Sequence, residues 1–220
     1  RWIAFVSMLA VVLLSLHIWW QGDFSFQTDT IEGRWHYEVN WPWIPALGVN
    51  IHLGLDGLSL LMVMLTGGLG LAAVVCSWRE IQKHVGFFYL NLLWNLGGVL
   101  GIFLALDLFL FFFFWELMII PMYFLIVLWG HTSEQDEIPG GKGRSYAATK
   151  FFLFTQTSGL LLLISILALV FAHYFHSGTL TFDYDTLLHS GVRFKPEWEM
   201  LLMLGFFIAF LVVQSRVEAE

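Results

Sequence analysis

One glutamate stands in the middle of the most apolar stretch of the sequence. Glu116 follows four phenylalanines and a tryptophan, and the chain stays largely apolar from there to Trp129. A helix that begins near Leu108 places Glu116 about 12 Å deep at 1.5 Å per residue, close to the midplane of a bilayer. A charge at that depth costs about 2.5 to 3.5 kcal/mol on insertion scales, so we expect Glu116 to have a function. The chemistry open to a carboxyl group there is the binding and release of a proton.

Pro121 and Tyr123 follow Glu116 within two helical turns. Pro121 has no backbone N–H, so the carbonyl oxygen of Leu117 loses its helical partner beside the glutamate. A polar, hydrated pocket is the expected solution, and Tyr123 shares the helix face of Glu116 and could bind a water chain there. The alternative for Glu116 is a structural carboxylate paired with a cation on another helix. The alternative for Tyr123 is a packing ring.

Lys150 stands at the start of another apolar stretch, which continues with Thr155-Gln-Thr-Ser-Gly159. A lysine at this depth either extends back to the membrane surface or faces the same interior cavity as Glu116, and the sequence leaves both open. Lys150 is therefore a second candidate for the proton path.

A third stretch carries Asn91 and Asn95 one turn apart, followed by Gly97 and Gly101. The two glycines are spaced as a GxxxG motif, which predicts that a neighbouring helix approaches closely on that face. For the asparagines we expect polar contacts between helices, with a role in conduction as the alternative.

Three other residues have plainer expected roles. Asp56 precedes Gly57-Leu-Ser59 and is expected to cap the N-terminus of a helix. Asp107 divides a long apolar run and is expected at the turn between two helices. The single cysteine, Cys76, cannot form an internal disulfide or ligate an iron-sulfur cluster with other cysteines of these 220 residues. We expect it to be a small buried hydrophobe.

The composition predicts an all-α polytopic membrane protein. Of the 220 residues, 58% are hydrophobic and only 12% are charged, which is typical of chains that cross a bilayer repeatedly. A crossing needs about 20 apolar residues, and we predict six of them in a single transmembrane domain over residues 1–213. The predicted spans are residues 2–20, 55–78, 87–106, 109–129, 147–171 and 198–213.

The loops fix a predicted orientation. Residues 21–52 form a long outer loop, in which Trp41-Pro-Trp43-Ile-Pro45 predicts an extended or hairpin segment on the membrane surface. Residues 131–145 form an inner, flexible polar turn, and residues 214–220 form a polar tail. Most basic residues fall on the side of Arg1, which is therefore predicted to be cytoplasmic. That side holds Arg1, Arg79, Lys83, Lys142, Arg144, Lys150 and Arg216, whereas the other holds Arg34, Arg193 and Lys195.

Other function classes are disfavoured by what the sequence contains. The net charge of −7 is spread over the loops, so no nucleic-acid partner is expected. The histidines, His17 and His173 included, are not spaced to hold two haems, and no dinucleotide fingerprint, metal-ligand cluster or activated nucleophile is present. We expect no cofactor and no metal in this chain.

Several sequence blocks resemble a known family. They are Asp56-Gly-Leu-Ser-Leu-Leu-Met62, Leu106-Asp-Leu-Phe-Leu-Phe-Phe-Phe-Phe-Trp-Glu-Leu-Met118, Pro121-Met-Tyr-Phe-Leu-Ile126, Leu128-Trp-Gly130, Ala148-Thr-Lys-Phe-Phe152 and Leu204-Gly-Phe-Phe-Ile-Ala-Phe210. From Arg1 to about Phe210 the chain closely resembles the subunit M family of the bacterial proton-pumping NADH-quinone oxidoreductase, respiratory complex I. The resemblance implies part of an antiporter-like fold with inverted repeats and broken helices.

The resemblance also implies a function. It makes the chain a proton-translocating subunit of the bacterial inner membrane, with Glu116 as an essential proton-path residue and a lysine on a discontinuous helix as its cation partner. Flavin, iron-sulfur clusters and quinone would belong to other subunits, and the partners would be other membrane subunits of complex I, especially neighbouring antiporter-like ones. After Phe210 the chain departs from the family pattern, and Val213 stands where the lysine is expected. We therefore expect an N-terminal fragment with a divergent tail, inactive alone.

Two other functions remain open at this stage. The first is a subunit of a multi-subunit sodium/proton antiporter, which shares the ancestral fold. The second is an inert structural fragment.

Overall fold

The computed structural model describes residues 1–22, 35, 37–130, 143–189 and 196–214, with side chains for all of these except 196–199 and 212–214. Most of the predicted inner turn at 131–145 and most of the polar tail at 214–220 lie outside the described residues. The elements are α1 (Trp2–Gln21), β1 (Tyr37–Ile44), the short 3-10 helix η1 (Pro45–Leu47), β2 (Val49–Leu55), α2 (Gly57–Glu80), α3 (Val85–Leu104), α4 (Leu108–Trp129), α5 (Arg144–Ser177), α6 (Tyr184–Leu188) and α7 (Pro196–Gln214).

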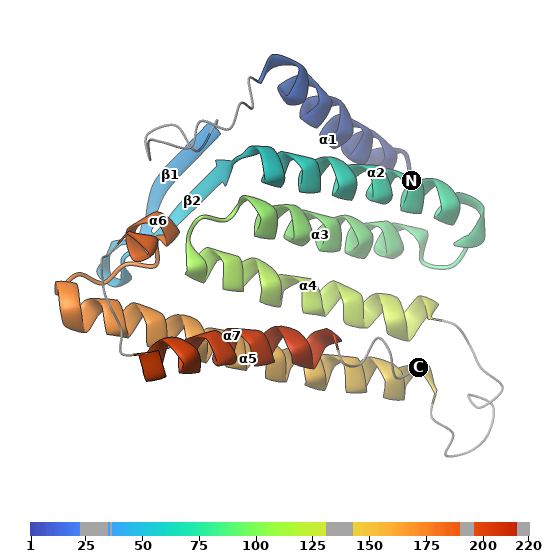
Figure 1. The fold of residues 1–220 in the computed structure, drawn as a ribbon. Coiled ribbons are helices and arrows are strands. Elements are labelled where there is room, and N and C mark those ends of the chain that lie inside the picture. Colours follow the sequence, from blue (N-terminus) through green and yellow to red (C-terminus); the bar gives the residue numbers. More distant parts are fainter. Residues whose placement is uncertain (23–34, 36, 131–142, 190–195, 215–220) are drawn as a thin grey trace.

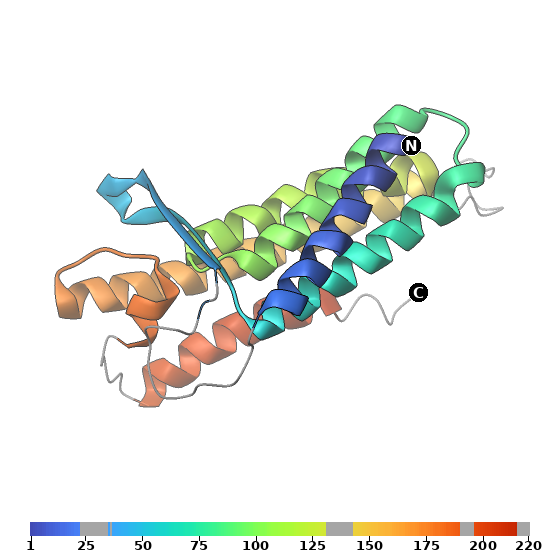
Figure 2. The same cartoon turned by 90° about the horizontal axis from the view of Figure 1, so that it is seen from above.

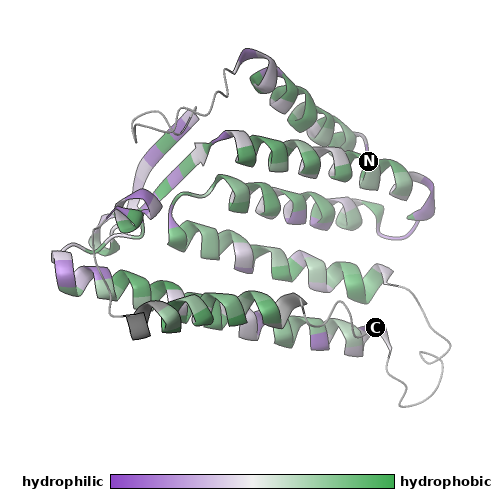
Figure 3. Cartoon of the chain, in the orientation of Figure 1, coloured by the Kyte–Doolittle hydropathy of each residue, from purple (hydrophilic) through white to green (hydrophobic). Residues whose placement is uncertain are grey.

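The long helices run back and forth between two ends of the molecule (Figure 1). Each contacts the next in the series α1, α2, α3, α4 and α5, and α7 packs on α5. Figure 3 shows apolar residues along the helices and polar residues concentrated at their ends and on the hairpin. Among the described residues, α1 to α5 are long and apolar enough to cross a membrane, and α7 contributes a shorter apolar portion, Met200–Leu211. The all-α polytopic fold class is confirmed.

The boundaries differ from the predicted spans chiefly at α5. This helix begins at Arg144 and ends at Ser177, whereas the predicted span covers residues 147–171. The predicted inner turn therefore ends earlier than residue 145. The chain leaves α5 through Gly178 in the left-handed conformation, which suits glycine because it has no Cβ.

A β-hairpin covers one end of the helices (Figure 2). Strands β1 and β2 are antiparallel, with Trp41 opposite Ile51 and an irregularity after Pro42. Proline cannot donate to a ladder, and β1 carries it on the exposed strand. The extended segment predicted at Trp41 to Pro45 is thus confirmed as a hairpin. At the turn, Gly48 has φ +66°, and a Cβ there would overlap the Leu180 carbonyl oxygen.

The segment before α4 joins this hairpin to α6. The backbone N–H of Leu106 donates to the His52 carbonyl oxygen over 2.9 Å, and the N–H of Leu108 donates to that of Phe182, also over 2.9 Å. The N–H of Tyr184 donates back to Leu106. Hairpin, α4 start and α6 are therefore tied together at the same end, which is the predicted outer side.

The opposite end brings Arg1 and the turn after α2 together. The guanidinium of Arg1 donates to the Ile81 carbonyl oxygen over 2.7 Å, and the indole N–H of Trp129 donates to the Lys83 carbonyl oxygen over 3.2 Å. Buried residues of α1, α2 and α3 form one apolar cluster, namely Ala4, Met8, Val74 and Tyr89. Cys76, two residues after Val74, points about 200° away from it around the helix and is exposed. Its predicted burial is therefore wrong.

Candidate functional site

Glu116 lies in the ninth position of α4 and is half-buried. Pro121 is fully buried inside the same helix, so the carbonyl oxygen of Leu117 has no backbone N–H of Pro121 to accept from. A carboxylate and a carbonyl oxygen without its usual helical partner thus occur in adjacent residues within an apolar helix. Such groups need a polar partner or water in a membrane.

Helix α5 supplies that partner. The side-chain amide nitrogen of Gln156 donates to Glu116 Oε2 over 2.9 Å. Gly159, three residues later and therefore on the same side of α5, is buried against Glu116, and a Cβ at that position would overlap Oε1. Among the described residues, Glu116 Oε1 is buried and has no hydrogen-bond partner. The carboxyl group is thus held against α5 by one oxygen, with the other left for a proton or a water.

Tyr123 also lies on the side of α4 that meets α5. Its ring packs edge-on against Phe152 of α5 at a centroid distance of 6.1 Å and against Phe124 at 5.8 Å. These contacts are those of a packing ring, the alternative considered for Tyr123 above. Its place in the proton path stays a prediction.

Lys150 lies near the start of α5 and is half-buried. Nine residues separate it from Gly159, which corresponds to two and a half helical turns and places the two positions on opposite sides of α5. Because Gly159 faces Glu116, the backbone of α5 aims Lys150 away from that carboxylate. Its place in the proton path also stays a prediction.

Helix α3 approaches α4 through a different pair of glycines from the predicted one. A Cβ at Gly98 would meet Met118, and a Cβ at Gly101 would meet the Phe114 ring, whereas a Cβ at Gly97 would have nothing within 4 Å. The close-approach face is therefore Gly98 and Gly101, and the prediction of Gly97 was wrong. Spacings of three and four residues both return to nearly the same side of a helix, so the sequence alone does not separate them.

The two asparagines of α3 have different surroundings. Asn91 is buried, and its amide nitrogen donates to the Phe87 carbonyl oxygen of its own helix over 2.8 Å. The side-chain oxygen of Asn95 is buried and has no hydrogen-bond partner within the described part of the chain. The amide nitrogen of Asn91 is therefore paired within α3, and the described residues show no hydrogen bond from Asn91 to another helix.

Asp107 does more than the expected turn. Its Oδ1 accepts from the backbone N–H groups of Phe109 and Leu110 at the start of α4, over 2.9 and 3.0 Å, and its Oδ2 accepts from Asn50 of the hairpin over 3.0 Å. Burial raises the pKa of this carboxyl above its ordinary value, although these three hydrogen bonds act in the opposite direction and the charge of Asp183 adds to the rise. Asp107 thus caps the helix that carries Glu116 and fastens the hairpin to it.

A second acidic residue, Asp183, is paired with Asp107 through an isolated β-bridge. His52 of β2 is 4% exposed and lies between two carboxylates, with Nδ1 2.7 Å from Asp183 Oδ1 and Nε2 2.7 Å from Glu38 Oε1. We call Glu38, His52 and Asp183 the outer clasp. Asp183 also caps α6 by accepting from Thr186.

The outer clasp sets the ionisation of Asp183. Burial acts to raise the pKa of Asp183, but hydrogen bonds from Thr186 and His52, with the charge of His52, outweigh it and hold that pKa below its ordinary value. Each ring nitrogen of His52 lies within hydrogen-bond distance of one carboxylate, so the row joins β1, β2 and α6.

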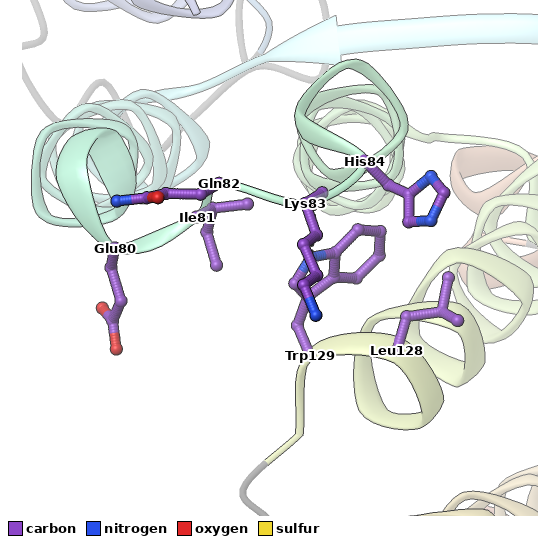
Figure 4. A pocket seen from close by; sticks show the side chains of 7 residues that line it. All are labelled: Glu80, Ile81, Gln82, Lys83, His84, Leu128 and Trp129. Carbon is purple, nitrogen blue, oxygen red and sulfur yellow. Dashed lines mark hydrogen bonds between the residues drawn. The ribbon is translucent and has the colours of Figure 1, made fainter.

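A pocket lies at the other end of the molecule, between the turn after α2 and the end of α4 (Figure 4). Figure 4 shows the Lys83 side chain beside the Trp129 ring. Trp129 is 13 residues after Glu116, about 20 Å along the helix, so this pocket is separate from the site around Glu116. Its lining residues are Glu80, Ile81, Gln82, Lys83, His84, Leu128 and Trp129.

Two features of these sites were missed from the sequence. Gln156 stood in a polar run inside an apolar stretch, and an amide at that depth is itself a signal of a buried partner. The outer clasp had no local signal, because its members are 14 and 131 residues apart.

Comparison with known proteins identifies the family of the chain. The sequence profile of the family described as "NADH:quinone oxidoreductase/Mrp antiporter, TM" matches residues 105–217, which continues past Phe210, where the resemblance was expected to stop. NADH-quinone oxidoreductase subunit M of Pseudomonas aeruginosa is 58% identical over 213 residues, covering 96% of this chain and 41% of that protein. The chain therefore spans about two fifths of the length of this relative.

Solved structures show the same fold. A chain of respiratory complex I from Thermus thermophilus with bound NADH matches with a TM-score of 0.66 and 27% identity, covering 96% of this chain and 38% of that one. A chain of the Mrp complex from a Dietzia species matches with a TM-score of 0.65 over 94% of this chain and 20% of that one, at 23% identity, which shows the fold alone. Because the family profile matches more than half of its residues, and α1 to α5 are apolar spans, the chain is a multi-pass membrane protein that belongs to the NADH:quinone oxidoreductase/Mrp antiporter transmembrane family.

Proposed function

We propose that this chain is a proton-translocating membrane subunit of an NADH-quinone oxidoreductase, with Glu116 as its proton-binding carboxyl group. The observation that carries the proposal is the setting of Glu116 inside α4. One carboxyl oxygen is held by Gln156, and the other is buried without a hydrogen-bond partner among the described residues. The 58% identity to a subunit M supports the oxidoreductase rather than the sodium/proton antiporter.

The chemistry asked of this chain is a proton transfer. Glu116 Oε1 takes up a proton from water on one side and releases it toward the other when its surroundings change. The Leu117 carbonyl oxygen, which has no N–H of Pro121 to accept from, offers a water molecule an acceptor next to that carboxyl group. Lys150 and Tyr123 are proposed to line the path on the inner side.

The redox chemistry is proposed to take place elsewhere. NADH, flavin, iron-sulfur clusters and quinone would bind other subunits of the complex, and quinone reduction there would drive the change around Glu116. The proposed neighbours are further membrane subunits, antiporter-like ones in particular, in a bacterial inner membrane. On this view the chain has no redox centre of its own and is inactive alone.

The test is Glu116→Gln, introduced into the chromosomal gene, with Glu80→Gln as the matched control. Glu80 is an exposed carboxylate at the end of α2 and has no part in the proposed path. Membrane vesicles are then assayed for NADH oxidation, for NADH-driven acidification and for the amount of assembled complex. We expect Glu116→Gln to abolish acidification while assembly persists, and Glu80→Gln to behave as wild type.

Two outcomes would contradict the proposal. Normal acidification by the assembled complex in Glu116→Gln would remove Glu116 from the path and indicate a structural role for the chain. Sodium-dependent discharge of a pH gradient in vesicles that do not oxidise NADH would indicate an antiporter subunit instead.

A further inference from the structure

Gln156 is the one polar side chain shown in contact with the Glu116 carboxylate among the described residues. It lies in the middle of α5, half-buried, with Ser158 and Gly159 buried beside it. We propose that Gln156 is a positioning residue of the proton site, whose carboxamide keeps the Glu116 carboxyl group hydrogen-bonded in both of its protonation states. This inference rests on the function proposed above.

The carboxamide suits this role because it carries a donor and an acceptor on one rotatable group. Its NH₂ donates to an ionised carboxylate, which is the arrangement seen over 2.9 Å. After rotation by 180°, its oxygen accepts from the O–H of a protonated carboxyl group. A lysine in the same place would pair only with the ionised form, and a leucine with neither. Gln156 can therefore hydrogen-bond Glu116 before and after a proton binds, and it adds no charge to the protein interior.

Gly159 provides the space that this arrangement needs. A side chain there would overlap Glu116 Oε1 and push the carboxyl group away from α5 and out of reach of Gln156. Position 159 is three residues after Gln156, so the two residues form one face on which the carboxyl group rests. The hydroxyl groups of Thr155 and Thr157 instead donate to carbonyl oxygens of their own helix, over 2.7 Å each.

The experiment replaces the carboxamide by an apolar group of similar length, Gln156→Met, in the chromosomal gene. The matched control is Thr157→Val on the exposed side of the same helix. NADH-driven proton flux is measured in membrane vesicles between pH 5.5 and 9 and normalised to the assembled complex. A hydrogen bond to a charged group is about twice as strong as one between neutral groups, so the loss of Gln156 penalises the ionised carboxylate more.

We expect the pH profile of Gln156→Met to move by about one unit toward higher pH, with about fivefold less flux at the half-maximal point of the wild-type acid limb. Thr157→Val should keep the wild-type profile. In Gln156→Glu the two carboxyl groups can share one proton, so flux should persist on the acid side and be lost on the alkaline side. A residue that only packs would lower the flux at every pH without moving the profile.

Gly159→Ala tests the second residue of the face on which the Glu116 carboxyl group rests. We expect at least a tenfold loss of flux per assembled complex, whereas Gly97→Ala, at a helical glycine with open space beside it, should be silent. A wild-type profile in both Gln156→Met and Gln156→Glu overturns the positioning role. If both Gln156 variants keep the wild-type profile but Glu116→Gln abolishes flux, the proposed function stands without the positioning role of Gln156. If Glu116→Gln is also silent, the proposed function itself fails.

Discussion

The contact between α3 and α4 yields a sharp prediction, because it fixes the helix that carries Glu116. In Gly101→Ala the added Cβ would lie 2.5 to 2.6 Å from three atoms of the Phe114 ring. Ordinary carbon contacts are about 3.5 to 4.0 Å, so the ring or the helix must move by roughly 1 Å. The Phe114 side chain has few rotamers and lies between two packed helices, so its ring has few alternative positions. Overpacking of this kind costs about 1 to 3 kcal/mol.

We therefore expect Gly101→Ala to lower the free energy of unfolding by about 2 kcal/mol relative to Gly97→Ala. The two variants make the same chemical change on one helix, and only Gly101 has a neighbour within 4 Å. The measurement is denaturant unfolding of the purified protein in detergent micelles, followed by circular dichroism. Adding Phe114→Leu should recover part of the loss, since it removes the ring atoms that the new methyl group meets. Equal effects of the two alanines, or no coupling with Phe114→Leu, would refute the reasoning.

Two further predictions concern the caps outside the membrane spans. Because hydrogen bonds hold the pKa of Asp183 below its ordinary value, its contribution to stability is complete above that ordinary value and is lost as the pH falls through the lowered one. Asp183→Asn should therefore flatten the acid limb of a stability-against-pH curve measured by thermal unfolding in detergent, and an unchanged limb would show that His52 and Thr186 do not act through this carboxylate. Asp56 accepts from the Ser59 N–H over 2.7 Å, so Asp56→Ala should cost about 1 kcal/mol in the same denaturant assay, and Asp56→Ser should recover most of it. An unchanged free energy of unfolding in Asp56→Ala would mean that water replaces the cap.

The sequence predicted much of the helical architecture because hydropathy sums over about 20 residues and tolerates local errors. Glu116 was found in the same way, since its cost in an apolar stretch is large and needs no knowledge of its neighbours. The hairpin followed from two prolines that exclude a helix between Trp41 and Pro45.

Single-residue orientation was less predictable. Gly97 and Gly98 differ by about 100° around α3, and only the contact with α4 decides which one faces it. Cys76 was expected to be buried because cysteine usually is, yet a lipid-facing position has no comparable cost for an apolar side chain. Gln156 required the phase of α5 relative to α4, which a single sequence does not contain.

The outer clasp has a consequence for how the chain inserts into a membrane. Glu38 and His52 precede α2, whereas Asp183 follows α5, so the described helices α2 to α5 lie between them. Four crossings are an even number, and only an even number returns the chain to the side from which it started. A helix that failed to insert, or a pair that inserted as one, would leave His52 and Asp183 on opposite faces of the bilayer. Closure of the clasp therefore reports that an even number of these helices crosses the bilayer.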